Sequence, residues 1–259
     1  MIASNLEAYL ARIGCHRPLT PSAETLRQLQ VAHLLTVPFE NLSIHAGEPI
    51  VLDEAALFEK IVVRRRGGFC YELNGLFAAL LRDLGFRVSM LSAGVARTEG
   101  GFGPEFDHMT LLVELERRWL ADVGFGDSFR EPLLLDERAD QVQGRRAYRI
   151  RPDGERLVLL QRDAGGEWEA QYRFGLEPQA IAAYAGMCRH HQNSPQSSFT
   201  QRRICSRATP EGRITLSPMR LITTRGGEQT ERTVADEAEH AALLREHFGI
   251  VMPGRELSG

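Results

Sequence analysis

The sequence predicts an α+β fold with three parts: an N-terminal helical bundle over residues 1–85, a central antiparallel β-barrel over 86–195 and a C-terminal α/β segment over 196–259. Up to about residue 85, apolar residues recur at steps of three and four, which is typical of helices. Beyond it they cluster in short Val- and Leu-rich segments between turn residues, which is typical of strands. Helical spacing returns near the end of the chain, over residues 236–248.

Four helices are predicted before residue 85. After a first amphipathic helix, Thr20 and Pro21 form an N-cap and first-turn pair that opens the second. Asp53 is the expected N-cap of the third helix. The fourth helix has apolar residues at helical spacing, and Gly85 stands where a helix ends in the left-handed conformation. Cys70 therefore lies in the first turn of this fourth helix.

The middle of the chain predicts an antiparallel meander or barrel. Turn residues at 152–154 and 165–166 separate short apolar segments. The expected strands are residues 86–96, 108–115, 119–123, 148–150, 157–161 and 168–174. A helix over 178–188 then leaves this region, and the last strands are expected near 202–206, 214–216 and 221–224.

The composition is that of an ordinary globular protein. Of 259 residues, 43% are hydrophobic and 25% charged, and the net charge of −3 argues against nucleic acid as the main partner, because such proteins usually carry a basic excess. No run approaches the roughly 18 apolar residues of a membrane helix, and the N-terminus has no secretion signal. The four cysteines lack CxxC pairing and zinc-ligand spacing, so we expect reduced thiols, no metal and a cytoplasmic location.

Cys70 is the candidate nucleophile. The stretch RGGFCYELNGLF, residues 66–77, places it after two glycines that allow a sharp turn and close backbone approach. In the first turn of a helix, unpaired N–H groups and the positive end of the helix dipole favour an anion, so this position is expected to stabilise a thiolate. Because free cysteines are more often small core residues, chemistry at Cys70 also requires a base.

His108 and Asp122 are the candidate base and its carboxylate partner. His108 begins the segment HMTLLV and Asp122 ends the segment WLAD, and a hairpin turning near Glu116 would bring the two strands together. A carboxylate on one ring nitrogen fixes the imidazole tautomer, and the other nitrogen takes the proton from sulfur. The structural alternatives are a satisfied strand histidine and a turn-forming aspartate. The sequence separation between Cys70 and His108 does not by itself establish contact.

Two further clusters have an ordinary structural interpretation. The arginine run 64–66 is expected to form a solvated last turn that complements the helix dipole, with an anion site for a phosphorylated cofactor as the alternative. Cys188, His190 and His191 are close in sequence, but adjacent histidines point apart and no second ligand pair lies nearby, so no metal site is predicted.

Six motifs together resemble the arylamine N-acetyltransferase family. Three of them contain the candidate catalytic residues: RGGFCYELNGLF, FDHMTLLV and WLADVGFGDSFREPLLL. The others are YLARIG near the N-terminus, VPFENL at 37–42 and NSPQSSFT at 193–200. The resemblance runs from about residue 9 to about residue 224, and the joint order of the motifs makes it specific. Beyond residue 224 little is similar, so coenzyme contacts made by the C-terminal segment do not carry over.

The resemblance implies a helical bundle, a β-barrel and an α/β lid around a cysteine-protease-like catalytic core. It also implies an enzyme that uses acetyl-coenzyme A and the triad Cys70, His108 and Asp122, without a metal. In the implied ping-pong reaction, acetyl passes from the coenzyme to Cys70, and an aromatic amine, arylhydrazine or N-hydroxyarylamine then takes it.

The same resemblance places Phe39, Phe125 and Phe199 in the acceptor pocket, and Gly126 where the coenzyme passes close to the backbone. Core packing for the aromatic residues and a plain loop glycine are the structural alternatives. Three other functions are compatible with the motifs: an amide synthase of the same family, a cysteine hydrolase or transglutaminase-like enzyme that needs no coenzyme A, and a non-enzymatic ligand-binding module.

Overall fold

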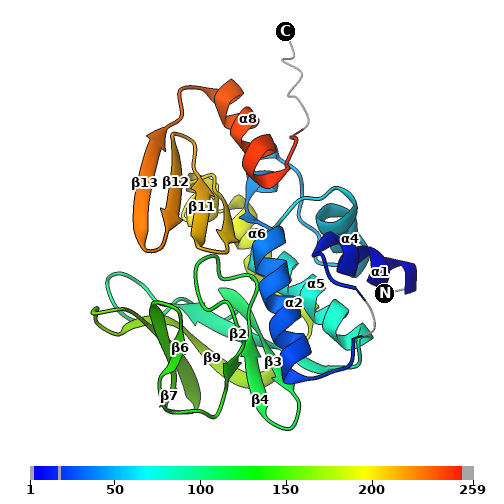
Figure 1. Cartoon of the computed structure of the whole chain (residues 1–259), viewed down its shortest axis with the longest axis vertical. Coiled ribbons are helices and arrows are strands. Elements are labelled where there is room, and N and C mark those ends of the chain that lie inside the picture. The colour runs from blue at the N-terminus through cyan, green and yellow to red at the C-terminus, as the bar shows by residue number, and fades with distance from the viewer. Residues whose placement is uncertain (1–2, 17–18, 253–259) are drawn as a thin grey trace.

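The structure is a computed structural model that describes residues 3–16 and 19–252. Its N-terminal part is helical, as predicted (Figure 1). The helices are α1 (Ala3–Arg12), α2 (Ala23–Thr36), α3 (Leu42–Ala46), α4 (Glu54–Phe58) with a π-helical turn at Glu59–Val63, and α5 (Cys70–Asp83). Because α5 is buried along almost its whole length, it forms the centre of the largest apolar core.

The helix starts follow local hydrogen bonding. Asp53 caps α4 as predicted, because its carboxylate accepts a first-turn N–H at 2.9 Å. The predicted cap of α2 at Thr20 is wrong. Ser22 is the cap, because its extended backbone lets its hydroxyl accept the N–H of Thr25 at 3.1 Å.

The middle of the chain forms one antiparallel sheet of eight strands that curls into a nearly closed barrel, which confirms the predicted fold class. The strand order is β5-β4-β3-β2-β9-β8-β7-β6. The strands are β2 (Arg87–Val95), β3 (His108–Glu114), β4 (Arg118–Ala121), β5 (Leu133–Leu134), β6 (Gln141–Gln143), β7 (Arg146–Asp153), β8 (Arg156–Asp163) and β9 (Glu169–Gln179). Pro178 pairs with Leu91 inside the sheet, so the helix predicted from residue 178 begins later. It is a 3₁₀ turn at Ile181–Tyr184 followed by α6 (Ala185–Asn193).

Glutamine side chains join the two edge strands, β5 and β6. Gln141 accepts the N–H of Leu134 at 2.7 Å and donates to the carbonyl oxygen of the same residue at 3.0 Å. Gln143 accepts the N–H of Glu131 at 3.0 Å and donates to its carbonyl oxygen at 2.7 Å. Each amide reproduces the pair of bonds that a neighbouring strand would make, so the side chains complete the barrel.

Replacing Gln143 by Ala should destabilise the protein by about 1–3 kcal/mol, because backbone groups near residue 131 lose their partners. The free energy of unfolding, measured with urea, tests this. Val142→Ala is the matched control in the same strand, and its effect should stay within about 0.5 kcal/mol because Val142 is 69% exposed. Equal effects of the two changes would contradict a closing role for the amide.

A second antiparallel sheet has the order β1-β10-β11-β12-β13. Its strands are β1 (Phe39–Glu40), β10 (Cys205–Thr209), β11 (Gly212–Leu216), β12 (Arg220–Arg225) and β13 (Glu228–Thr233), and the short helix α7 (Ser198–Gln201) precedes it. With α8 (Glu237–Phe248) the sheet encloses a separate apolar core. We did not predict β13, because its six residues are all polar and exposed.

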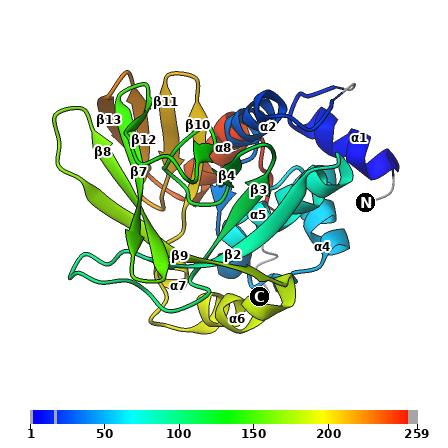
Figure 2. The ribbon, with the colours of Figure 1, turned by 90° about the horizontal axis from the view of Figure 1, so that it is seen from below.

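Both sheets meet the N-terminal helices. Figure 1 shows α2 running alongside the barrel, with one end toward the second sheet, and Figure 2 shows α6 near one end of β2 and β9. β1, from the N-terminal third of the chain, pairs with β10. The domain boundaries at 85/86 and 195/196 stay a prediction. In the described part of the chain, no helix has both the length and the apolar character to cross a membrane.

Candidate active site

Cys70 is the first residue of α5, as predicted, and the two glycines before it make close contacts with their neighbours. A Cβ on Gly67 would lie 1.9 Å from the carbonyl oxygen of Pro38, and one on Gly68 would lie 2.7 Å from the side chain of Glu72. Because the chain at β1 crowds Gly67 and the Glu72 side chain of α5 crowds Gly68, only glycine fits at both positions. The two glycines therefore set the position of the cysteine.

His108 and Asp122 meet, as the predicted hairpin requires. β3 and β4 pair in antiparallel register, and the His108 Nε2 and Asp122 Oδ2 atoms are 2.7 Å apart. Both side chains are buried. Burial by itself raises the pKa of Asp122, but the charge and hydrogen bond of His108, with the carboxylate's other hydrogen bonds, lower it below its ordinary value. The pair is thus an ionised carboxylate that holds an imidazole.

Four groups outside the predicted triad hold Asp122. Its Oδ1 atom accepts hydrogen bonds from Asn74 Nδ2 and from the N–H of Gly124, both at 2.9 Å. Its Oδ2 atom accepts the Tyr172 hydroxyl at 3.1 Å, and its backbone N–H donates to Gln30 Oε1 at 3.1 Å. Sequence reasoning missed all four residues. The spacing of Asn74, one turn after the cysteine on the same helix face, was a usable signal. Tyr172 and Gln30 are distant in sequence and have none.

Asn74 also connects α5 to the strand that contains the imidazole. Its Nδ2 atom donates to the carbonyl oxygen of Met109 at 2.6 Å, and the N–H of Met109 hydrogen-bonds toward the sulfur of Cys70. A Cβ on Gly124 would lie 2.7 Å from the Cα of Cys70, so the loop after Asp122 packs directly on the cysteine. The structure thus places Cys70 beside chain neighbours of both His108 and Asp122.

The electrostatics of Cys70 differ from the expectation of a thiolate stabilised by the helix start. Burial raises the pKa of the Cys70 thiol well above its ordinary value, and the carboxylates of Asp122 and Asp107 raise it further. The hydrogen bond from the N–H of Met109 lowers the pKa of the Cys70 thiol, but by less than burial raises it. An anionic sulfur at this site therefore needs a positive partner, which His108 would supply by taking the proton.

The three predicted pocket aromatics lie in two groups. The ring centroids of Phe39 and Phe199 are 6.1 Å apart, and Phe199 packs edge-on against Phe69, the residue before the cysteine, at 5.5 Å. Phe125 packs edge-on against His108 at 5.0 Å. Phe39, Phe125 and Phe199 are all partly exposed and pack against the buried cores, so their place in an acceptor pocket stays a prediction.

Gly126 follows in the same loop and differs in kind from Gly124. It has φ of +90°, and nothing in the described residues lies within 4 Å of the place a Cβ would take. Glycine is favoured there by backbone conformation, whereas Gly124 is needed because the chain approaches the cysteine closely.

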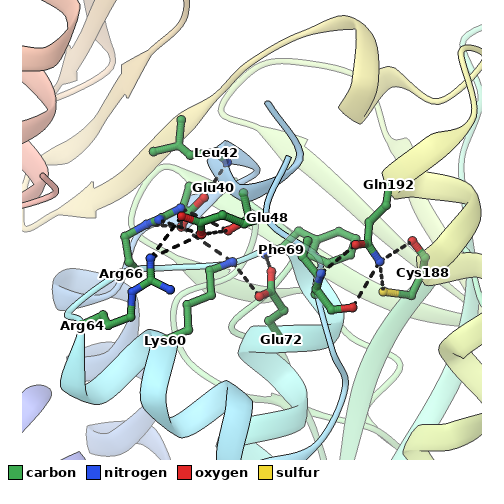
Figure 3. A network of polar contacts seen from close by, with 12 residues as sticks. Glu40, Leu42, Glu48, Lys60, Arg64, Arg66, Phe69, Glu72, Cys188 and Gln192 are labelled. Carbon is green, nitrogen blue, oxygen red and sulfur yellow. Dashed lines mark hydrogen bonds and ion pairs between the residues drawn. The ribbon is translucent and has the colours of Figure 1, made fainter. Parts of the chain in front are cut away.

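The expectation that the whole arginine run is solvated is wrong for Arg66, which is 2% exposed. Its guanidinium donates to Glu40 Oε1 from Nη2 at 2.9 Å and from Nε at 3.0 Å. Lys60 Nζ lies 2.6 Å from Glu72 Oε1 and 3.9 Å from Glu40 Oε1, so two buried acids and two bases form one network (Figure 3). Glu72 Oε2 also accepts the N–H of Phe69 at 3.1 Å, which ties the network to the start of α5.

Cys188, His190 and His191 do not converge on a common point. Cys188 accepts a hydrogen bond from Gln192 at 3.2 Å, His190 is exposed, and His191 is buried against Asp107. Within residues 3–16 and 19–252, no group of three or more His, Cys, Asp or Glu side chains is arranged to hold a metal ion.

A buried cysteine at a helix start, beside the chain neighbours of an imidazole–carboxylate pair from a barrel, is the arrangement expected of enzymes that transfer acyl groups through a thiol. Comparison with known proteins narrows this class. A family model described as N-acetyltransferase matches residues 22–257. The arylamine N-acetyltransferase / N-hydroxyarylamine O-acetyltransferase of Salmonella typhimurium is 35% identical, over 96% of this chain and 90% of that protein. Proansamycin X synthase of Amycolatopsis mediterranei is 32% identical, over 93% and 95%.

Solved structures agree with these relatives. The arylamine N-acetyltransferase of Salmonella typhimurium superposes with a TM-score of 0.91 at 34% identity, covering 100% of this chain and 96% of that one. The Mycobacterium marinum enzyme in complex with CoA gives 0.88 at 31%, covering 95% and 92%. A Bacillus cereus arylamine N-acetyltransferase described with a unique Cys-His-Glu catalytic triad gives 0.88 at 26%, covering 97% and 100%. The chain belongs to the arylamine N-acetyltransferase family and is an acyltransferase.

Proposed function

We propose that this chain transfers acetyl from acetyl-coenzyme A to aromatic amines, by a ping-pong reaction through an acetyl thioester on Cys70. The proposal rests on the 2.7 Å contact between His108 and Asp122 beside the buried cysteine. It is further supported by the relatives named arylamine N-acetyltransferase and by the Mycobacterium marinum structure with bound CoA. Arylhydrazines and N-hydroxyarylamines are proposed acceptors of the same kind.

The proton path follows from the imidazole tautomer. Because Asp122 accepts a hydrogen bond at Nε2 of His108, Nδ1 is the nitrogen left to take the thiol proton. The Cys70 sulfur then attacks the thioester carbonyl, and the proton passes to the departing coenzyme sulfur. In the second half-reaction, the amine nitrogen attacks the acetyl carbonyl and gives a proton to His108, which returns it to the leaving Cys70 sulfur.

We propose that the acceptor ring binds among Phe39, Phe125 and Phe199, and that the coenzyme passes over Gly126. The partial exposure of these residues supports this, as does the packing of Phe125 on His108 and of Phe199 on Phe69, the residue before the cysteine. The open space beside Gly126 leaves room for a ligand chain. We also propose a cytoplasmic location, which the four free cysteines support.

Incubation with acetyl-coenzyme A, without an acceptor, should leave one acetyl group on Cys70 and release coenzyme A. Mass spectrometry of peptides locates the acetyl group, and Cys205→Ser is the control, because that buried thiol lies in β10, away from the triad. If no acetyl adduct formed and no coenzyme A were released, the result would contradict the proposal. A hydrolase would release coenzyme A continuously, and a binding module would return the thioester intact. An adduct only with larger acyl thioesters would favour an amide synthase.

Phe199→Ala should raise the KM for an aromatic amine on the order of tenfold, because a pocket loses apolar surface. The rate at which acetyl-coenzyme A acylates the enzyme should stay unchanged, so pre-steady-state release of coenzyme A is measured in parallel. Phe102→Ala is the control, since that partly buried ring lies against Arg173 in the barrel. A lower acylation rate with an unchanged KM for the amine would show that Phe199 does not belong to the acceptor pocket.

A further inference from the structure

A second buried imidazole–carboxylate pair lies beside the proposed triad. His191, on α6, has its Nε2 atom 3.4 Å from Asp107 Oδ1 and its Nδ1 atom 3.2 Å from the hydroxyl of Ser197. The histidine is 8% exposed, and Asp107 is partly buried. The proposed reaction uses neither residue.

Both members of this pair lie next to the proposed triad: Asp107 is a chain neighbour of one triad residue, and His191 contacts a chain neighbour of another. Asp107 directly precedes His108 in the chain. The ring of His191 stacks on Tyr71, which directly follows Cys70, with centroids 6.0 Å apart and planes at 25°. The Tyr71 hydroxyl in turn donates to the carbonyl oxygen of Asp107 at 3.2 Å. The pair His191 and Asp107 is therefore connected to the segments that position Cys70 and His108.

The negative charge of Asp107 acts electrostatically on Cys70. Although burial raises the pKa of Asp107, the His191 imidazole 3.4 Å away, the hydrogen bond from the N–H of Val95 and the charge of His108 lower it overall, so the carboxylate is ionised. That negative charge raises the pKa of the Cys70 thiol, so an uncompensated Asp107 opposes thiolate formation.

The groups around His191 identify Asp107 as its counter-charge. From α6 the His190 ring lies 5.7 Å away, from α5 the Tyr71 ring stacks on it, and from the 194–201 segment the Ser197 hydroxyl and the Phe199 ring approach. Asp107, from the loop before β3, supplies the carboxylate. A proton on His191 would therefore be held by Asp107 and would cancel its field at the cysteine.

We propose that protonated His191 neutralises Asp107 and so allows Cys70 to ionise at neutral pH. His191 is in this sense a positioning residue that acts through Asp107. The inference rests on Cys70 being the nucleophile of the proposed function, and it adds a second site that sets the pH range of the reaction.

The test is the pH dependence of Cys70 alkylation by iodoacetamide, followed by mass spectrometry, which needs neither coenzyme nor acceptor. His191→Gln keeps a donor for Asp107 but removes the positive charge, so the whole profile should move to higher pH, on the order of one unit. At pH 7 the alkylation rate should then fall by roughly tenfold. The control is His190→Gln, a change at the exposed neighbour, whose profile should match the wild type.

The double variant His191→Gln/Asp107→Asn decides between charge and packing. Without the anion the histidine is not needed, so the double variant should regain the wild-type profile. An unchanged profile in His191→Gln with only a lower Tm would overturn the proposal, as would a double variant that stays shifted. If His191→Gln does not fold, Asp107→Asn alone is informative, because an upward shift in that variant overturns the proposal and a profile at or below the wild type supports it.

These outcomes are separable from those of the proposed function. No acetyl adduct, together with a shifted alkylation profile in His191→Gln, would reject the acetyltransferase and keep the second pair. A normal acetyl adduct together with an unshifted alkylation profile in His191→Gln would keep the acetyltransferase and reject the role of His191.

Discussion

Replacing Asp122 by Asn should lower the rate of Cys70 acetylation on the order of 10³- to 10⁴-fold, as loss of the correct tautomer does in other triads. The amide oxygen can keep the hydrogen bonds from Asn74 and Gly124, which places the amide nitrogen toward His108 Nε2. That nitrogen donates, so the ring proton moves to Nδ1, and the base can no longer accept from sulfur. The measurement is single-turnover release of coenzyme A, with Tm as the check on folding.

Asp122→Glu is the matched control for this change. It keeps a negative acceptor, and the Bacillus cereus relative is described with a Cys-His-Glu triad. We expect Asp122→Glu to retain far more activity than Asp122→Asn, although the longer side chain must fit among the same donors. Full activity of Asp122→Asn would exclude the carboxylate from the mechanism.

Replacing Arg66 by Met should destabilise the protein by about 3–5 kcal/mol, because it leaves the carboxylate of Glu40 buried with incomplete compensation. Glu40 is fully buried, and although burial raises its pKa, the charges of Lys60 and Arg66 lower it overall, so it is ionised in the folded protein. After the change, only the more distant Lys60, at 3.9 Å, and the N–H of Leu42 would remain as partners. The free energy of unfolding in urea is the measurement.

The same arginine run supplies the control. Arg64→Met removes an exposed guanidinium that lies 3.3 Å from Glu48, and such surface pairs contribute only about 0–1 kcal/mol. Similar losses from the two substitutions would show that the buried network does not need its charges balanced. The contrast matters for the site, because the N–H of Glu40 donates to the carbonyl oxygen of Gly68, two residues before the cysteine, at 2.9 Å.

Much of the local structure was predictable because it depends on neighbouring residues. Asp53 caps its helix, Gly85 ends another with φ of +92°, and Cys70 begins α5, all from interactions within a few positions. The contact between His108 and Asp122 was also predictable, since one short hairpin sets its register.

The errors have a common physical origin. Arg66 looked like a solvated helix end, because its partner Glu40 is 26 residues away in the chain. Thr20 and Ser22 are both good caps, and the path of the chain into α2 selected Ser22. The strand β13 shows no apolar alternation, and its pairing with β12 depends on the neighbouring strand rather than on its own residues.

By itself, the sequence determined the fold class and most of the helices and strands, the family motifs and three residue types suited to acyl transfer through sulfur. Only the tertiary structure decided that Cys70 packs against the loop after Asp122, and that Asn74 and Tyr172 orient the carboxylate. It also decided that burial raises the pKa of the thiol against the effect of the helix start. The physical reason is that desolvation and charge depend on which groups surround an atom in space, and distant parts of the chain supply most of those groups.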